Sequence, residues 1–410
     1  MKIGVLTHNY PRFTGDFSGV FVQQLCQELV RQGEEVHVIA PYDAAYAPEI
    51  LARAQPRLHL YRYAWSDAAH QLGYMRTMQA DIRMKANTYL LSPTMFLAGI
   101  RAAQRVARAQ KLDVLHAHWV LPNGFIAAVA SRRLHIPLTV SIPGSDALVA
   151  AQNPLFRKMA RFAFAQAGLI TANSRELRQV AVDHLGADPA RFDLIIYGVD
   201  PDKLRPDENA GRALRTRLGI PDDAFITLAV GRMVYKKGFD VLLRALALLP
   251  DGPRPVHGVF IGDGDLWETW QALGRELGLQ RVHWVGRVPN DEMAAWYNMA
   301  DVLVMPSVTK PVDGLNVCVL DAMACGKPVI GSDCAGNDLV IEDGVNGFIF
   351  PEGEQEALAQ ALARLRESPE LARRMGAASR RKIDEAYGWP HLARRYRAHF
   401  RRLVQERAGA

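Results

Sequence analysis

The chain has 410 residues, of which 49% are hydrophobic and 22% are charged, and this predicts a soluble globular protein of two or three domains with ample core. No stretch approaches the roughly 18 apolar residues that a membrane-spanning helix needs, and the first apolar run is too short for a signal peptide. The net charge of +6 comes without a basic motif interleaved with aromatics, so no nucleic-acid partner is expected.

The positive charge is unevenly distributed along the chain. Residues 1–200 contain 21 Lys and Arg against 15 Asp and Glu, residues 201–387 contain 22 against 27, and residues 388–410 contain six against one. A basic N-terminal half and a basic tail indicate an anionic partner on that side, such as a membrane surface. Arg-rich solvated helices without any partner explain the same pattern equally well.

Cysteine usage indicates neither disulfides nor a metal site. The cysteines are Cys26, Cys318, Cys325 and Cys334. No two of them form a CxxC pair, so they are predicted to be reduced core residues. Their spacing to His116 and His118 matches no common zinc pattern, and no metal is expected.

The chain opens with a strand–helix–strand pattern. Residues 2–7 (KIGVLT) predict a buried strand, residues 19–32 a helix, and EEVHVIAP a second strand, as at the start of a doubly wound sheet. A GxGxxG motif is lacking, which argues against a dinucleotide-dependent oxidoreductase. Gly19 at the helix start either admits a diphosphate close to the backbone or serves tight helix packing, and the sequence leaves both open.

Residues 43–110 give the weakest signals. A strand is expected near Leu58–Tyr61, and residues 74–110 predict helical pieces interrupted at Pro93. The Tyr, Met, Leu and Phe side chains of this stretch fit either an acceptor groove or ordinary core, and core is the favoured interpretation.

Two later strands of the first half end in unusual residues. DVLHAH carries His116 and His118 at its carboxyl end, and a helix is expected from Asn123, so these histidines are placed where α/β sheets bind ligands. PLTVSIPGSDA is a strand that ends in a turn containing Pro143.

A strand at residues 168–174 is followed by Ser174 as the predicted N-cap of the next helix. The charge and the Pro and Asp content then change, which places the domain boundary near Asp200.

The second half begins a new sheet with a strand–loop–helix pattern at residues 226–246. Arg232 follows the strand, and Lys237 precedes a helix that is expected to start near Gly238. Two cations near a helix start suit a diphosphate leaving group. Lys236 alone is interpreted as solvated surface.

The following segment alternates strands and glycine turns. FIGDG is a strand whose turn contains Gly262 and Gly264, and VHWVGRV is a strand whose exit lies near Gly286–Val288. Asn290 is the predicted N-cap of the next helix.

A strand, a loop and a buried helix follow from Val302. The strand VLVMPS leads to a loop with Asp313 and Gly314, and the helix LNVCVLDAMACG stops at Gly326 before the strand PVIGS. The carboxyl end of a strand that feeds a helix N-terminus is a binding place for anions. Asp321 is expected about two turns into this helix, so that one carboxylate faces the ligand from the loop and one from the helix.

These segments together resemble the retaining glycosyltransferases of family 4, which have the GT-B fold. The motifs that carry the resemblance are HAHW-x-x-P-x-G, the G-R-x-x-x-x-K-G string from Gly231 to Gly238, Asp313-Gly314, Asp321, AMACGKPVI and AGNDLVIEDGVNG. The resemblance covers nearly the whole chain and is weakest at residues 43–110. It implies an α/β protein of two Rossmann-like doubly wound domains that face a cleft.

The resemblance also implies which part of the chain binds each substrate. Residues 1–200 with 388–410 would bind the acceptor, with a last helix from Trp389 to about Arg407 crossing back onto the N-terminal domain, and residues 201–387 would bind a nucleotide-sugar. The reaction would be metal-independent transfer of a sugar, with retention, to a glycan or lipid-linked acceptor in cell-surface polysaccharide or glycolipid synthesis. The expected location is the cytoplasm, with peripheral contact to the inner face of the membrane through the basic regions.

Roles for single residues follow from the same resemblance. Arg232 and Lys237 would stabilise the departing diphosphate together with the helix after Gly314, Asp313 would orient the sugar, and Asp321 would bind the ribose. His118 is the catalytic candidate of the first half. The remaining candidates for contact with the nucleotide-sugar are Gly19, Gly262, Gly264, Val288, Leu315, Asn316 and Val317. No cofactor is implied beyond the nucleotide-diphosphate-sugar donor itself.

The chain departs from the family pattern at three positions. The family usually has glutamate at both acid positions, where this chain has Asp313 and Asp321, and histidine where this chain has Pro143. Proline offers neither a side-chain donor nor an N–H. The alternative hypothesis is therefore a non-catalytic or weakened relative that binds a nucleotide-sugar or glycan as a partner subunit. A GT-B sugar epimerase is a third hypothesis, for which no catalytic residues can be assigned.

Overall fold

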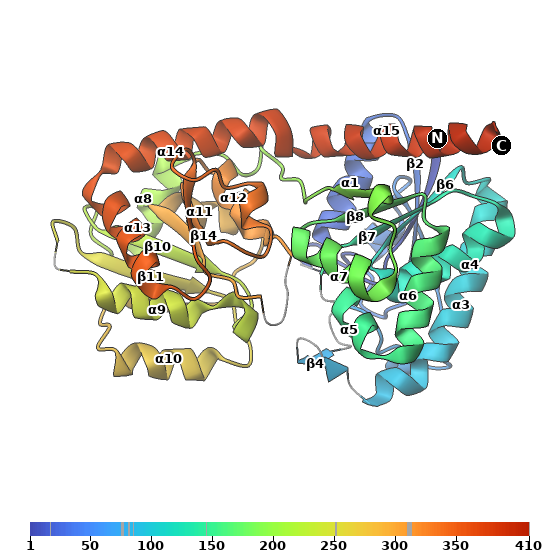
Figure 1. Cartoon of the computed structure of the whole chain (residues 1–410), viewed down its shortest axis with the longest axis horizontal. Helices are drawn as coiled ribbons and strands as arrows, with labels where there is room; N and C mark the ends of the chain where they lie inside the picture. Colours follow the sequence, from blue (N-terminus) through green and yellow to red (C-terminus); the bar gives the residue numbers. More distant parts are fainter. Residues whose placement is uncertain are drawn as a thin grey trace. The chain divides into compact units, whose positions relative to one another are not determined.

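Both halves of the chain fold as strand–helix repeats. The structure is a computed structural model that describes residues 1–16, 18–74, 78–80, 83–84, 86–144, 146–250, 252–309 and 314–409. The chain divides into an N-terminal unit, Met1–Ile196 with Trp389–Ala410, and a C-terminal unit, Tyr197–Gly388 (Figure 1). Each unit has a parallel sheet with helices on both faces, which confirms the predicted doubly wound α/β class.

The N-terminal unit contains a parallel sheet in the order β3-β2-β1-β6-β7-β8-β9. Its strands are β1 (Lys2–Leu6), β2 (Glu35–Pro41), β3 (Arg57–Tyr61), β6 (Val114–His118), β7 (Leu138–Ile142), β8 (Leu169–Ala172) and β9 (Phe192–Leu194). The strand order reverses between β1 and β6, so that the loops after these two strands meet at one edge. A small antiparallel pair, β4 (Met78–Ala80) and β5 (Arg83–Met84), lies outside the sheet.

Two layers of helices cover this sheet. The helices of the unit are α1 (Val20–Arg31), α2 (Pro48–Leu51), α3 (Ala86–Gln110), α4 (Phe125–Leu134), α5 (Asp146–Gln152), α6 (Pro154–Gln166), α7 (Arg175–Leu185) and α15 (Trp389–Ala408). One buried cluster joins β1 to α1 and α15 through Ile3 and Val5, and another joins Leu6 to α3, α4 and α6. The alternation of side chains along β1 therefore fills a core on each face. The predicted return of the last helix to the N-terminal unit is confirmed.

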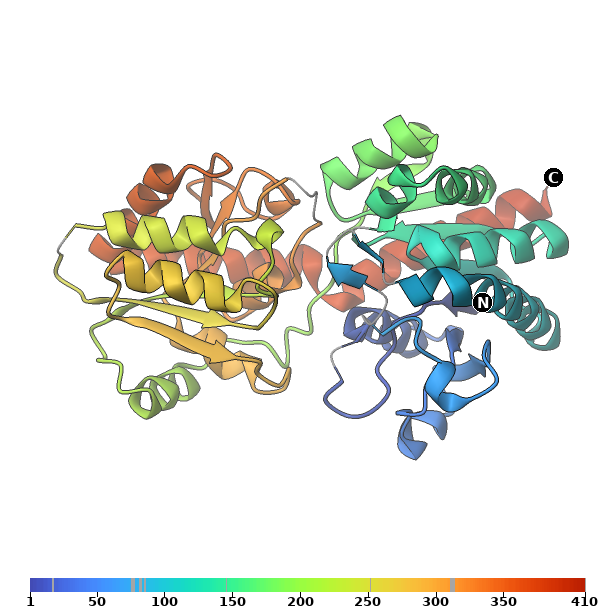
Figure 2. The same ribbon diagram turned by 90° about the horizontal axis from the view of Figure 1, so that it is seen from below.

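The C-terminal unit contains a parallel sheet in the order β12-β11-β10-β13-β14-β15. Its strands are β10 (Phe225–Val230), β11 (Val256–Ile261), β12 (Val282–Gly286), β13 (Val302–Met305), β14 (Val329–Ser332) and β15 (Gly347–Phe350). Its helices are α8 (Glu208–Arg217), α9 (Phe239–Leu248), α10 (Trp267–Glu276), α11 (Met293–Met299), α12 (Val317–Ala324), α13 (Gln355–Glu367) and α14 (Pro369–Lys382). In Figures 1 and 2, α9 and α10 cover one face and α11 and α12 the other.

Two local predictions are wrong. Helix α3 continues through Pro93 instead of breaking there, because the buried side chains that follow, such as Ala103 and Val106, hold the helix against the sheet. Helix α11 begins at Met293 after Glu292, so Asn290 is not its N-cap. By contrast, the hydroxyl of Ser174 accepts a hydrogen bond from Leu177 N at the start of α7, as predicted.

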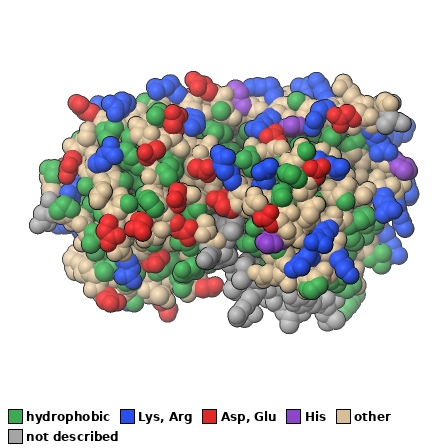
Figure 3. Space-filling model, in the orientation of Figure 1, with side chains coloured by type: hydrophobic (Ala, Val, Ile, Leu, Met, Phe, Trp, Pro, Cys, Tyr) green, Lys and Arg blue, Asp and Glu red, His purple; other side chains and the backbone are tan. Residues whose placement is uncertain are grey.

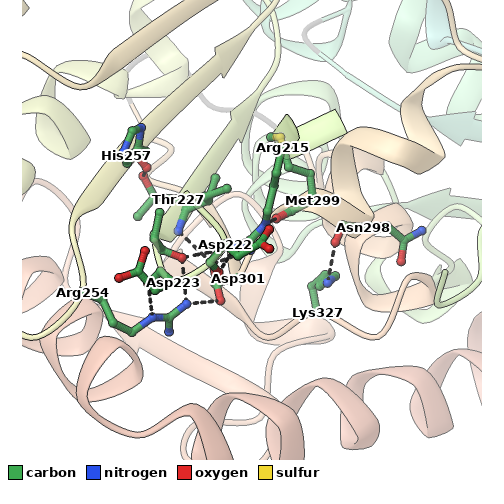
Figure 4. A network of polar contacts seen from close by, with 12 residues as sticks. Arg215, Asp222, Asp223, Thr227, Arg254, His257, Asn298, Met299, Asp301 and Lys327 are labelled. Carbon is green, nitrogen blue, oxygen red and sulfur yellow. Dashed lines mark hydrogen bonds and ion pairs between the residues drawn. The ribbon is translucent and has the colours of Figure 1, made fainter. Parts of the chain in front are cut away.

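A polar network closes the amino end of the C-terminal sheet (Figure 4). The carboxylate of Asp301, which precedes β13, accepts hydrogen bonds from Arg215 Nη2 and Arg254 Nη2, both at 2.8 Å, and from the backbone N–H of Ile226 at 2.9 Å. Arg215 also donates to the carbonyl of Met299 at 2.9 Å. Arg215 and Arg254 thus share one carboxylate and also donate to backbone carbonyls, which is typical of a structural ion-pair network.

Candidate active site

The candidate site lies at the carboxyl end of the C-terminal sheet. The strand order reverses between β10 and β13, and open α/β sheets bind ligands outside the carboxyl ends of the strands at such a reversal. The segments after β10 and β13 carry the two cations and the helix N-terminus that the sequence singled out. The fold therefore brings the predicted donor motifs of this unit to one edge.

Backbone contacts hold the loops of this edge together. Gly231 N donates to Ile261 O at 2.9 Å, and Met233 N donates to Asp263 O at 2.7 Å. Gly262 N in turn donates to Gly286 O at 2.8 Å. The loops after β10, β11 and β12 are thus one connected layer of backbone.

The glycines of the β11 turn are required by this packing. A Cβ atom on Gly262 would lie 1.9 Å from Gly231 O, and one on Gly264 would lie 2.7 Å from Met233 O. Both also have positive φ, 128° and 150°, where side chains are disfavoured. Packing alone therefore explains these two residues, and their contact with a nucleotide stays a prediction.

Lys237 lies at the N-terminus of α12. It ends a short 3-10 turn, Tyr235–Lys237, and its side chain is 8% exposed. Its Nζ donates to Oδ1 of Asn316, the residue that precedes α12, and Asn316 Nδ2 donates to Ser307 Oγ at 3.2 Å. A buried ammonium group is thus held by a neutral amide beside the positive end of a helix dipole.

The other cations of this region differ from each other in burial. Arg232 follows β10, as predicted, and it is exposed. Lys236 is only 4% exposed, so its interpretation as solvated surface is wrong. Its carbonyl accepts a hydrogen bond from Val308 N at 3.0 Å, which ties the turn to the exit of β13 and draws the residue inward.

The segment before α12 is partly described. Asp313 lies outside the described residues, whereas Gly314 and Leu315 are buried and Val317 is the first helical residue. Because the helix begins at Val317 and not at Leu315, Asp321 lies about one turn into it, not two.

Asp321 is a half-buried residue of α12. Its Oδ2 accepts a hydrogen bond at 3.2 Å from the hydroxyl of Tyr297, a residue that is 2% exposed on α11. Burial raises the pKa of the Asp321 carboxyl to about 7. The group is therefore poised between its neutral and charged forms near physiological pH.

Val288 follows β12 and is half-buried. Its neighbour Arg287 donates from Nε to Asp263 Oδ2 at 2.6 Å, so the exits of β11 and β12 are joined by side chains as well as by backbone.

The remaining candidates, Gly19 and His118, belong to the N-terminal unit. Gly19 precedes α1 with a φ of 72°, and a Cβ atom there would lie 2.1 Å from Asn9 O. Tight packing is therefore sufficient to explain Gly19, and contact with a diphosphate stays a prediction.

His118 ends β6 and is 3% exposed. Among the described residues neither ring nitrogen has a hydrogen-bond partner, and the ring packs 4.2 Å from that of His116 and 5.9 Å from that of Phe21. Burial lowers the pKa of His118 to about 3, so the imidazole is neutral at pH 7.

Pro143 lies directly after β7 and is half-buried. Its carbonyl accepts a hydrogen bond from Asn173 Nδ2 at 3.2 Å. The residue thus offers its backbone oxygen to the protein, and its ring brings no polar group to this loop.

Several polar residues of the two edges were missed by the sequence analysis. Ser307 and Tyr297 position Asn316 and Asp321, and Asn123 donates to His118 O at 2.7 Å and contacts His8 Nδ1 at 2.8 Å. Ser307 ends the predicted strand VLVMPS, and Asn123 begins the helix predicted after DVLHAH. A polar residue just after a strand often contacts a ligand or a site residue, and this position could have identified both residues.

The cysteines are free and buried, as predicted. Among the residues that the structure describes, no three His, Cys, Asp or Glu side chains are grouped to hold a metal ion.

Two family models match the chain. The Glycosyltransferase Family 4 model matches residues 18–203 and the Glycosyl transferases group 1 model matches residues 212–382. The D-inositol 3-phosphate glycosyltransferase of Streptomyces griseus is 33% identical over 331 residues, covering 73% of this chain and 68% of that protein. The putative teichuronic acid biosynthesis glycosyltransferase TuaC of Bacillus subtilis is 28% identical over 368 residues, covering 89% of each.

A solved structure has the same fold. Anabaena Alr3699/HepE, crystallised in complex with UDP, superimposes with a TM-score of 0.74 at 19% identity, covering 97% of this chain and 99% of that chain. With both family models matched across the two units and a relative at 33% identity, the chain belongs to the GT-B glycosyltransferases of family 4.

Proposed function

We propose that the protein transfers a sugar from a nucleotide-diphosphate-sugar to a glycan or lipid-linked acceptor, with retention of anomeric configuration, in the synthesis of a cell-surface polysaccharide or glycolipid. The observation that carries the proposal is the buried Lys237, held by Asn316 at the N-terminus of α12. Such a site matches the charge that grows on a departing diphosphate.

The catalytic contribution of the C-terminal unit would be electrostatic. Lys237, the exposed Arg232 and the backbone N–H groups at the start of α12 would share the negative charge of the leaving group. These groups supply the charge that a divalent ion supplies elsewhere, so the transfer is proposed to need no metal.

The two carboxylates would bind the rest of the donor. Asp321, oriented by Tyr297, would accept hydrogen bonds from the ribose hydroxyls in its ionised form, and Asp313 would orient the sugar. Because Asp321 has a pKa raised to about 7 by burial, donor binding would weaken as the pH falls below 7.

The N-terminal unit would contribute no charged base. His118 stays neutral because burial lowers its pKa to about 3, and Pro143 carries no acceptor side chain. The departing phosphate is therefore the group proposed to take the acceptor proton, on the same face from which the sugar leaves. That arrangement gives retention.

The acceptor and location are proposed from the relatives and the charge distribution. Relatives are named for D-inositol 3-phosphate and teichuronic acid, both anionic, and UDP and UDP-glucose are bound by a structural neighbour. No helix within the described part of the chain has the length and apolar character needed to span a bilayer. Action in the cytoplasm, with peripheral contact to the inner face of the membrane, fits these observations.

A donor panel tests the proposal. Purified protein is mixed with UDP-, GDP-, ADP- and TDP-sugars, with and without a lipid extract, and the free nucleoside diphosphate is quantified for wild type and Arg232→Ala. Release from one donor, lost in the variant, is the expected result. The anomeric configuration of the product, read by NMR, tests retention, and a chelator tests the lack of a metal requirement.

One observation favours the second candidate, a weakened relative that binds a nucleotide-sugar as a partner subunit. The loop after β7 presents Pro143 where the family usually has a histidine. Donor binding without release under every condition would favour this candidate, and Pro143→His would then restore turnover.

A further inference from the structure

Helix α12 begins after a residue whose type suits an N-cap but whose side chain does not act as one. Asn316 directly precedes the helix and has φ −80° and ψ 127°, an extended conformation that is usual for an N-cap residue. An asparagine at this position normally accepts a hydrogen bond from the first turn of its helix. The side chain of Asn316 accepts none from α12, all of whose residues the structure describes. Its oxygen is therefore available to another group.

Other helices of the chain do use such a residue as a cap. Asn153 precedes α6 with φ −107° and ψ 125°, and its Oδ1 accepts hydrogen bonds from Leu155 N at 2.9 Å and from Phe156 N at 3.2 Å. Three further helices, α7, α8 and α14, are capped in the same way by Ser174, Asp207 and Ser368. Because Asn316 and Asn153 have similar backbone conformations, the backbone does not explain why α12 lacks this cap.

The side chain of Asn316 is held between two buried groups. Its Oδ1 accepts a hydrogen bond from Lys237 Nζ, and its Nδ2 donates to Ser307 Oγ at 3.2 Å. Ser307 is fully buried, and its carbonyl accepts hydrogen bonds from Ser332 Oγ at 2.7 Å and from Cys334 Sγ at 3.1 Å. The amide is thereby oriented with its oxygen toward the ammonium group and away from the helix.

The neutrality of this amide suits a unit that carries more acidic than basic side chains. Residues 201–387 contain 22 Lys and Arg against 27 Asp and Glu, and Figure 3 shows Asp and Glu side chains scattered over the visible face of the C-terminal unit. The unit therefore has no excess of positive charge to attract an anion, and binding depends on where individual cations lie. An amide holds Lys237 without adding a negative charge of its own.

We propose that Asn316 is a positioning residue that acts through Lys237. By giving its oxygen to Lys237 instead of to α12, it holds the ammonium group at the N-terminus of this helix. It also does not compete with a diphosphate for the N–H groups of the first turn. This inference rests on the proposed function and specifies how the anion site is prepared before the donor arrives. It differs from the direct contact with the nucleotide-sugar that the family resemblance implies for Asn316.

A double-mutant cycle tests whether Asn316 acts through Lys237. UDP, GDP and ADP are titrated calorimetrically into wild type, Asn316→Ala, Lys237→Ala and the double variant. Asn316→Ala is expected to weaken binding of the preferred diphosphate by about tenfold in the wild-type background. In the Lys237→Ala background the same change is expected to cost less than about twofold, because the group that Asn316 positions is already absent. Equal losses in both backgrounds would show general damage to the site and would overturn the proposal.

Asn316→Asp separates positioning from a role in stability. The new carboxylate would hold Lys237 as an ion pair, so Tm is expected to stay at or above that of wild type. The added negative charge would compete with the diphosphate for the ammonium group, so affinity is expected to fall by about tenfold or more. A role in stability alone predicts that this variant binds the diphosphate as well as wild type does, and that result would contradict the proposal.

Asn153→Ala is the matched control, because it removes an asparagine that does cap its helix. It is expected to lower Tm by about 2–4 °C and to leave diphosphate affinity within about twofold of wild type. A loss of affinity equal to that of Asn316→Ala would attribute the effect to lower stability and would overturn the inference. Unchanged affinity of Asn316→Ala, with a wild type that binds, would overturn this inference alone. A wild type that binds none of the three diphosphates would overturn the proposed function and the inference with it.

Discussion

The two ends of the C-terminal sheet carry the same kinds of charged groups in different arrangements. At the amino end, Asp301 is bound by Arg215 and Arg254 and by a backbone N–H (Figure 4). At the carboxyl end, Lys237 is held by the neutral amide of Asn316 and Asp321 by the neutral hydroxyl of Tyr297.

We infer from this difference that the charged groups at the amino end stabilise the fold and that those at the carboxyl end bind the ligand. The paired groups at the amino end are used within the fold, whereas the buried ammonium group beside the N-terminus of α12 lies at the carboxyl end of the sheet, where α/β folds bind anions. Substitutions of the charged groups at the amino end should therefore act mainly on folding, and substitutions of Lys237 and Asp321 at the carboxyl end mainly on donor binding and catalysis.

The largest expected effect is that of Lys237→Ala. Removal of one preorganised charge at the leaving group should lower kcat by about 10²- to 10³-fold, equivalent to roughly 3–4 kcal/mol of barrier. Steady-state kinetics with the donor found in the panel, together with Tm, measure it. A fall in Tm that parallels the fall in kcat would show that Lys237 acts on folding and not on catalysis.

Gly262→Ala should damage the carboxyl end through packing. The new Cβ would lie 1.9 Å from Gly231 O at a φ of 128°, which should cost roughly 3 kcal/mol of folding free energy. Urea unfolding measures the loss. Gly278→Ala is the control, because φ is also positive at 70° but no atom lies within 4 Å of the new Cβ. Equal losses in both variants would mean that strain in φ, and not the contact of the two loops, is what matters.

Asp301→Ala should destabilise without a direct effect on catalysis. It leaves Arg215 and Arg254 without their shared carboxylate, and because the group is partly exposed the expected loss is about 2–3 kcal/mol. Urea unfolding gives the free energy, and kcat is measured well below Tm. A tenfold fall in kcat at a temperature where the variant is folded would contradict the claim that Asp301 acts on folding alone.

Asp321→Asn should have a smaller, pH-dependent effect. Burial raises the pKa of this carboxyl from 3.8 to about 7, so its contribution to stability is complete below pH 4 and is lost as pH rises toward 7. The variant should therefore match wild type in Tm near pH 4 and exceed it at pH 8. The KM for the donor at pH 8 should rise by about tenfold, since one charged acceptor is lost. A constant difference in Tm across this range would contradict the assignment of the raised pKa.

Much of the fold could be predicted from the sequence because strand and helix periods are local properties. The strands at residues 2–7 and 168–174, the N-cap Ser174 and the last helix from Trp389 were confirmed. The predictions at Pro93 and Asn290 failed, the first because tertiary packing overrides a local preference for breaking a helix.

The candidate site was predictable only as a set of positions. The sequence pattern placed Lys237 and Asp321 near helix starts, and the family resemblance added Asn316. The burial of Lys236 and the contact of Tyr297 with Asp321 depend on segments that meet only in the folded unit. The pairing of the tail arginines with Glu34 and Asp193 was hidden for the same reason, since the partners are more than 190 residues apart in sequence.

The most direct test of the central claim is calorimetric titration of UDP, GDP and ADP into wild type, Lys237→Ala and Arg254→Ala. The account predicts that one diphosphate binds wild type and Arg254→Ala with similar affinity and binds Lys237→Ala at least tenfold more weakly. Equal affinity for wild type and Lys237→Ala, or a loss confined to Arg254→Ala, would contradict the placement of the diphosphate at the carboxyl end of this sheet.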